Sequence, residues 1–283
     1  MAKRLHADAR DLGGFQVQRI LPNKAQKMVG PFIFLDYLGP AHFQAGEGIN
    51  VRPHPHIGLA TLTYLFAGSM LHRDSLGSIQ EVQPGEVNWM TAGRGIVHSE
   101  RESFEVRTTA HSANGLQFWL ALPPEKAEID PSFQHVKREQ LPHRYRNNSM
   151  MRLIAGEAYG MTSPVRTHSP LFLLDVISQE GEFIDLPHAH WESALYVQQG
   201  RVRIDGEDYH AGDFVVLDNE RIEVLEFSRL VLLGGAAFAE KPYVRWNFVA
   251  YSRERITQAE DDWRAQRFPK IPGDEAEYTP LPS

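Results

Sequence analysis

The chain has 283 residues, of which 42% are hydrophobic and 23% charged, with a formal net charge of −7 and no cysteine. This length allows two domains of ordinary size, and the composition is that of a soluble globular protein. The absence of cysteine excludes disulfides and thiolate ligands, so any metal must be bound by nitrogen and oxygen. The negative net charge, without a cluster of Lys and Arg, argues against direct nucleic-acid binding.

Nothing in the sequence predicts a membrane or export signal. The first residues, Met1-Ala-Lys-Arg4, are basic, but no apolar run follows them, so no signal peptide is expected. The longest apolar run, Leu230 to Ala239, has ten residues including two glycines and is too short to span a bilayer. We therefore expect a cytoplasmic protein without membrane association.

The first chemical signal along the chain is a pair of histidines, His54 and His56. His98 and Glu100 form a second pair with the same i, i+2 spacing. Side chains at i and i+2 of a β-strand point to the same face. Two such strands side by side would direct three imidazoles and one carboxylate at one point. We interpret the four residues as a metal site, whereas one isolated pair would be read as solvent-facing residues of an edge strand.

Short strands are predicted between and beside these pairs. Residues 59–66 are apolar and β-prone and precede the turn Ala67-Gly68, while residues 78–83 and 86–90 flank the turn Pro84-Gly85. Short strands separated by turn residues are typical of an all-β sandwich or barrel.

A linker is expected after the first barrel. The charged stretch Glu125 to Gln140 is compatible with a helix, and residues 151–154 resemble the first strand of a second barrel. We place the boundary near residue 145, which gives an N-terminal barrel with the metal site over 1–145 and a C-terminal barrel over 146–283.

The end of the chain predicts one helix and a tail. Ser252 is the expected N-cap of a helix that carries Ile256, Ala259 and Trp263 on one face. The stretch from Lys270 to Ser283, rich in proline and acidic residues, is predicted to be loosely held.

The second half of the chain repeats landmarks of the first half. The matching pairs are His188 with His54, His190 with His56, Gly200 with Gly68 and Gly212 with Gly85. We interpret them as two copies of one β-barrel unit. Phe227 stands where Glu100 would fall, so the second copy keeps half of a site, and we expect it to be metal-free. A second site that uses Glu192, Glu223 or Glu226 with the two histidines stays open as the alternative.

Several longer motifs resemble the pirin family, a branch of the cupin superfamily. These are Gly13-Gly14-Phe15, Val29 to Asp36, Gly39-Pro40, Pro53 to Gly58, Val87 to Glu100 (VNWMTAGRGIVHSE), Gly115 to Pro123 and Ser252 to Ile256. The resemblance covers most of the chain. It implies an all-β bicupin of two tandem cupin-type β-barrels (double-stranded β-helices), with short helices in the linker and at the C-terminus. It also implies one metal in the N-terminal barrel, held by His54, His56, His98 and Glu100.

The resemblance further implies an oxidoreductase of the quercetin 2,3-dioxygenase type. Such an enzyme cleaves the ring of a flavonol-like substrate with O₂ and releases carbon monoxide. Imidazole and carboxylate ligands suit Fe(II), which is the expected metal, and also Mn, Co, Ni, Cu or Zn. Glu100 is the candidate catalytic base as well as a ligand.

Other residues near the motif are weaker candidates. Arg94, between Gly93 and Gly95, could orient the substrate, although a structural role in satisfying loop carbonyls is the alternative. Trp89, Gln117 and Trp119 could line a pocket for a flat aromatic substrate, although aromatic residues on barrel strands more often belong to the core.

The competing interpretation is a metal-dependent regulatory protein that binds a protein partner, as a transcriptional co-regulator or a modulator of a metabolic enzyme, without physiologically relevant catalysis. A deep pocket lined by aromatic side chains would favour the enzyme, and an exposed apolar patch beside the metal would favour the partner.

Overall fold

A computed structural model describes residues 2–12 and 15–282 of the chain. Gly13 and Gly14 of the first motif lie outside the described residues. The chain forms two compact units. The first unit consists of Ala9–Arg19, Phe34–Arg138 and Ala239–Ser283, and the second unit consists of Met1–Asp8, Ile20–Ile33 and Glu139–Phe238.

This division differs from a single boundary near residue 145. Near the N-terminus, β1 (Lys3–Leu5) pairs with β21 (Phe214–Leu217), so the start of the chain completes a sheet of the second unit. At the other end, the segment Ala239–Ser283 belongs to the first unit, because the buried face of helix α2 (Arg253–Arg264) packs against Ile57 and Val97. The local sequence pattern does not predict that the first residues belong to the second unit or that the last residues belong to the first unit.

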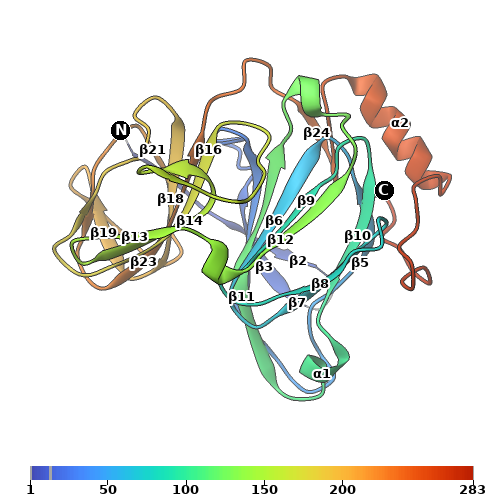
Figure 1. Ribbon diagram of the computed structural model, residues 1–283, viewed down its shortest axis with the longest axis horizontal. Coiled ribbons are helices and arrows are strands. Elements are labelled where there is room, and N and C mark those ends of the chain that lie inside the picture. Colours follow the sequence, from blue (N-terminus) through green and yellow to red (C-terminus); the bar gives the residue numbers. More distant parts are fainter. Residues whose placement is uncertain (1, 13–14, 283) are drawn as a thin grey trace. The chain divides into compact units, whose positions relative to one another are not determined.

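The first unit is built from two sheets (Figure 1). Its larger sheet has the order β12-β9-β6-β11-β4-β3-β2, and its smaller sheet has the order β5-β10-β7-β8. The strands are β2 (Asp8–Asp11), β3 (Gln16–Leu21), β4 (Phe32–Phe43), β5 (Asn50–His56), β6 (Leu59–Ala67), β7 (Met70–Asp74), β8 (Ile79–Val82), β9 (Val87–Thr91), β10 (Ile96–Arg101), β11 (His111–Ala121) and β12 (Ser132–Val136).

The second unit repeats this plan. Its larger sheet has the order β1-β21-β18-β23-β16-β14-β13, with β15 paired to β14, and its smaller sheet has the order β17-β22-β19-β20. The strands are β13 (His143–Arg146), β14 (Ser149–Ala158), β15 (Met161–Thr162), β16 (Leu171–Ser178), β17 (Phe183–Ile184), β18 (Glu192–Gln199), β19 (Arg201–Ile204), β20 (Glu207–His210), β21 (Phe214–Leu217), β22 (Ile222–Val224) and β23 (Ser228–Gly235). Matching strand orders confirm the prediction of two copies of one all-β unit.

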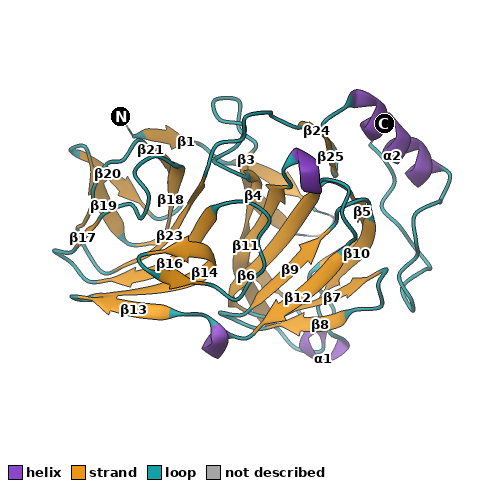
Figure 2. Ribbon diagram, turned by 45° about the horizontal axis from the view of Figure 1, so that its top comes forward, coloured by secondary structure: helices purple, strands orange, loops and turns teal. Residues whose placement is uncertain are grey.

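The remaining elements are few, as Figure 2 shows. They are α1 (Phe104–Arg107), two 3₁₀ turns at Pro124–Lys126 and Arg138–Gln140, the hairpin of β24 (Tyr243–Arg245) and β25 (Phe248–Ala250), and α2. None of the helices that the structure describes is long and apolar enough to span a bilayer.

The turn residues act as the sequence predicted. Gly68 directly follows β6 and Gly85 lies in the turn before β9, and both have positive φ, +80° and +84°. Ser252 caps α2 by accepting a hydrogen bond from the Arg255 amide, and Ile256, Ala259 and Trp263 are buried. The stretch 125–140, which is compatible with a helix, has two short 3₁₀ turns near its ends, Pro124–Lys126 and Arg138–Gln140, and strand β12 (Ser132–Val136) between them. Pairing of β12 with β9 overrides the helix-compatible composition in the middle of the stretch.

The prediction of a loosely held tail was wrong for the described part of the segment. Ile271 is buried, and the Thr279 amide donates to the Pro53 carbonyl over 2.8 Å. Asp274 forms hydrogen bonds with Ser99 and Arg101. Asp274 and Thr279 therefore make specific contacts with β5 and β10.

Candidate metal centre

Two neighbouring strands of the smaller sheet bring three of the four predicted ligands together, namely the histidines His54, His56 and His98. Strands β5 and β10 are antiparallel, with His98 opposite His54 and Ile96 opposite His56. The pairing shifts between His98 and Glu100, since Glu100 faces Val51, which leaves β5 with an extra residue before His54. On its other side β10 pairs regularly with β7, so His98 and Glu100 still point to one face.

The three imidazoles form a buried cluster. His54, His56 and His98 are at most 7% exposed. Each offers one ring nitrogen to a group in which these atoms lie within 4.8 Å of one another, so the group could hold a metal ion. Ring centroids are separated by 4.3 Å for His54 and His98 and by 5.0 Å for His56 and His98.

Hydrogen bonds fix the tautomers of two of the rings. His54 Nδ1 lies 2.8 Å from the Arg52 carbonyl, and His56 Nδ1 lies 3.0 Å from the Asn247 carbonyl. Because a carbonyl can only accept, Nδ1 carries the proton in both rings and Nε2 keeps its lone pair.

The orphaned ring nitrogens fit a bound metal. His56 Nε2 and both ring nitrogens of His98 are buried without a hydrogen-bond partner among the described residues. Buried nitrogen atoms without partners are costly unless something binds them. Burial lowers the pKa of His54 to about 4 and the pKa values of His56 and His98 well below their usual range. The imidazoles are therefore neutral, which is the ligating form.

Glu100 follows His98 by two positions on β10, but its carboxylate is not part of the group of ligand atoms found among the described residues. The Thr63 hydroxyl lies 2.8 Å from Gln117 Oε1 and 3.3 Å from Glu100 Oε1. Burial raises the pKa of Glu100 to about 7, although its hydrogen bonds with Thr63 and Gln117 lower it. Glu100 is 8% exposed, so its carboxyl group is buried.

His72 and Asp74 on β7 form a second His/carboxylate pair next to Glu100, and the sequence did not single them out. His72 stands opposite Glu100 on β7, and its Nε2 lies 2.9 Å from Asp74 Oδ2. The ring stacks on Phe133 of β12, with centroids 4.3 Å apart. His72 and Asp74 have the same i, i+2 spacing as the recognised pairs, and this spacing was the signal that could have found them.

Of the two tryptophans predicted to line the site, Trp119 lies next to the histidines and Trp89 does not. The Trp119 ring lies 4.9 Å from His56 and stacks on Phe34 at 3.9 Å. Trp89 is opposite Leu62, one position away from the Asn88–Thr63 pair. It therefore faces the side of the sheet away from Thr63 and Glu100, and its indole donates to Thr91.

The Arg94 side chain forms an ion pair with Asp130 at the surface. Its guanidinium pairs with Asp130, and both side chains are largely exposed, 63% and 78%. Its carbonyl accepts a hydrogen bond from Arg255 over 2.8 Å. The orienting role of Arg94 stays a prediction.

The second unit treats its histidines differently. His188 and His190 precede β18 in a loop, so their i, i+2 spacing does not place them on a strand. His188 stacks on Trp191 at 3.8 Å, and its Nε2 contacts the Glu157 carbonyl. His190 is exposed. The interior of this unit is filled by apolar side chains, among them Leu153, Leu195 and Leu232.

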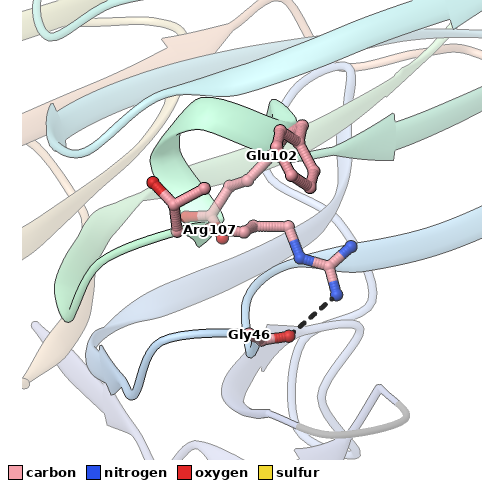
Figure 3. A pocket seen from close by; sticks show the side chains of 5 residues that line it. Gly46, Glu102 and Arg107 are labelled. Atoms are coloured by element: carbon pink, nitrogen blue, oxygen red, sulfur yellow. Dashed lines mark hydrogen bonds between the residues drawn. The ribbon is translucent and has the colours of Figure 1, made fainter.

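A surface cavity of about 540 Å³ lies elsewhere in the first unit, beside α1. Gly46, Glu102, Phe104, Arg107 and Thr108 line it, and none of these is a predicted site residue. Figure 3 shows the Arg107 guanidinium directed at Gly46, whose carbonyl accepts its hydrogen bond over 3.2 Å. Buried Glu102 accepts from the Ile49 amide and from His111.

Comparisons with known proteins decide the family. The pirin family model matches residues 14–120, and the model of the pirin C-terminal cupin domain matches residues 173–269. A "Pirin-like protein" of Caulobacter vibrioides is 47% identical, covering 98% of this chain and 97% of the relative. The chain belongs to the pirin family. Its two units are accordingly cupin domains, and the recognition made from the sequence is confirmed.

Two further proteins that the chain resembles carry a more specific name. A Pseudomonas aeruginosa protein named "Putative quercetin 2,3-dioxygenase PA1205" is 36% identical, covering 100% of this chain and 91% of the relative. The crystal structure of a quercetin 2,3-dioxygenase from Acinetobacter baumannii superposes with a TM-score of 0.92 at 34% identity. That match covers 100% of this chain and 95% of the other. Together they confirm the all-β bicupin fold.

Proposed function

We propose that this pirin is a metal-dependent dioxygenase for a flavonol-like substrate. One divalent metal, Fe(II) in the first place, would be held by His54, His56, His98 and Glu100. The observation that carries the proposal is the buried group of three neutral imidazoles, whose ligand atoms lie within 4.8 Å of one another beside a buried carboxyl group. The names of the Pseudomonas relative and the Acinetobacter structure support the choice of substrate.

When bound, such a metal would supply a Lewis acid at which a substrate hydroxyl group and O₂ can meet. The remaining chemistry belongs to side chains of the chain. Glu100, whose pKa burial raises to about 7, can in its ionised form take the proton of a substrate hydroxyl group. Thr63 and Gln117 hold its carboxyl group in place by hydrogen bonds.

The neighbouring rings favour a flat substrate. Trp119 stands edge-on to His56, and Phe133 covers His72. Both are partly buried, so each retains some accessible surface that an aromatic ring could cover. One flavonol and one O₂ would give the ring-opened product and carbon monoxide. The cytoplasmic location expected from the sequence stays a prediction.

The test is turnover under defined metal loading. The protein is loaded with Fe(II) under anaerobic conditions, quercetin is added, and oxygen uptake and carbon monoxide release are followed. Turnover should disappear in His98→Ala and persist in His190→Ala, which removes an exposed histidine of the second unit. Absence of turnover at full iron occupancy would contradict the proposal and favour the metal-dependent regulator with a protein partner.

A further inference from the structure

The strands that carry the candidate ligands are covered on their outer face by the end of the chain. We call residues 243–279 the C-terminal segment; it contains β24, β25 and α2. Figures 1 and 2 show α2 and the chain that follows it running beside β5 and β10. Because side chains of a strand alternate, the neighbours of the inward-facing ligands point outward to this segment.

The segment reaches one metal-binding histidine directly. The Asn247 carbonyl is the acceptor for His56 Nδ1, at 3.0 Å. Next to this contact, the Val249 amide donates to the Ile57 carbonyl over 3.1 Å, and Phe248 forms a β-bridge with Ile57. The hydrogen bond with Asn247 holds Nδ1 of the His56 ring toward the segment and leaves Nε2 as the ring nitrogen available to a metal.

Asp274 connects the segment to the second ligand strand. Its carboxylate accepts a hydrogen bond of 2.7 Å from Ser99, which lies between His98 and Glu100. It also accepts from Arg101 Nε at 3.1 Å and from Nη2 at 3.0 Å. The carboxylate is only 14% exposed, which strengthens these charge-assisted bonds.

The far end of the segment returns to β5. The Thr279 amide donates to the Pro53 carbonyl over 2.8 Å, and the Trp263 indole donates to the Thr279 carbonyl over 3.0 Å. Between these points Ile256, Ala259 and Trp263 share one apolar cluster with Ile57 and Val97. Both ligand strands are therefore fastened to the same segment, at more than one place each.

We propose that the C-terminal segment is a positioning element of the metal centre, with Asn247 and Asp274 as its positioning residues. It holds the orientation of His56 and the relative placement of β5 and β10, and so raises the affinity for metal. This inference rests on the proposed metal site. Partners that hold the ligands in place typically change metal affinity by about 10–100-fold.

The test compares two acidic residues of the same segment. Asp274→Ala removes the hydrogen bonds to Ser99 and Arg101. Glu275→Ala, the control, removes the neighbouring acidic side chain, which is exposed. Affinity for Ni(II) is measured by competition with a chromogenic chelator. We expect about tenfold weaker binding for Asp274→Ala and unchanged binding for Glu275→Ala.

Two further measurements separate positioning from a loss of fold. Hydrogen exchange of the peptides that cover β5 and β10 should be faster in metal-free Asp274→Ala than in Glu275→Ala, while circular dichroism stays that of the wild type. Asp274→Asn keeps an acceptor for Ser99 and should recover part of the affinity. If Asp274→Ala does not fold, Ser99→Ala removes one bond of the same contact and should weaken Ni(II) binding several-fold.

The outcomes are distinguishable. Wild-type affinity in Asp274→Ala, or in Ser99→Ala where that variant replaces it, would overturn the positioning role and leave the metal site intact. Failure of the wild-type protein itself to bind Ni(II) or Fe(II) would overturn the proposed metal centre, and the positioning role with it.

Discussion

Burial lowers the pKa values of the three histidines and raises the pKa of Glu100. In both cases it favours the uncharged form of the side chain. Burial makes the imidazoles neutral and favours the protonated form of the carboxyl group, so the cluster carries little charge of its own. A divalent cation would find lone pairs without competing protons on the rings. The buried ring nitrogens of His56 and His98 that have no hydrogen-bond partner among the described residues are available to bind a metal ion.

The first prediction concerns the ligands. His98→Ala or Glu100→Ala should weaken metal binding by more than the roughly 10–100-fold typical of losing a supporting residue. The fold should survive, because the surrounding core is apolar and the site is local. Metal content after dialysis, measured by atomic absorption, checks this. Full occupancy in either variant would show that the ligand has been wrongly assigned.

A second prediction at this scale uses the pair of His111 and Glu102 beside the surface cavity. Despite partial desolvation, hydrogen bonds to Thr109 and Glu102 raise the pKa of His111 above its usual value. A raised pKa stabilises the fold below the unfolded pKa of about 6.5, and this contribution is lost as pH rises through the folded pKa. Urea unfolding should give a larger difference between wild type and His111→Gln at pH 6 than at pH 8.5.

The Glu102 side chain is fully buried and the His111 side chain is 12% exposed, so water screens this pair less than an exposed pair, whose typical contribution is about 0–1 kcal/mol. A difference that grows with pH would contradict the sign of the pKa shift, and would mean that His111 is neutral in the folded protein throughout this range.

At the scale of elements, the close approach of β25 to the turn between β5 and β6 depends on a single glycine. Gly58 has a φ of +67°, and a Cβ there would lie 2.0 Å from the Val249 carbonyl oxygen. Gly77, in the turn between β7 and β8, also has a positive φ of +87°, but a Cβ there would meet nothing within 4 Å. The two glycines therefore differ in packing and share the same backbone requirement.

Alanine substitution should separate these two costs. Gly77→Ala should destabilise by about 1–2 kcal/mol, from the backbone conformation alone. Gly58→Ala adds an overpacking cost of about 1–3 kcal/mol and moves β25 away from Ile57. Denaturant unfolding of both variants provides the comparison. Equal free energies of unfolding would mean that β25 does not need its close contact with Gly58.

The elements also show where sequence reasoning succeeded. The spacing of His54, His56, His98 and Glu100 predicts one inward face of two strands, because strand alternation is a local property. Ser252 predicts the start of α2 for the same local reason. In contrast, β12 lies inside the stretch 125–140, whose composition is compatible with a helix, and its pairing with β9 depends on residues some 45 positions away. The Asn247 carbonyl that orients His56 has no side-chain signal at all.

At the scale of the molecule, two units of the same plan differ in what fills them. The first unit places histidines, Glu100, Thr63 and Gln117 in its interior, whereas the corresponding cluster of the second unit is apolar. Repeated strand order was predictable from the repeated glycines and histidines. The exchange of terminal segments between units was not, because it depends on which sheet edge each segment finds.

The prediction at this scale concerns the number of metal ions bound per chain. We expect about one metal per chain, and His188→Ala should leave that value unchanged, since the His188 ring is stacked on Trp191 and bonded to a carbonyl. Metal analysis per mole of protein, in the wild type and the variant, provides the measurement. A fall in metal content would revive a site in the second unit.

The contact between His56 and Asn247 also sets an order of events during synthesis. The two residues are 191 positions apart, and Asp274 and Thr279 follow later still. A ribosome that has completed the first barrel has produced all four candidate ligands but not the segment that orients them. A nascent chain should therefore acquire its metal tightly only after translation has passed residue 279. Chains stalled before that point would compete poorly for scarce metal in the cell.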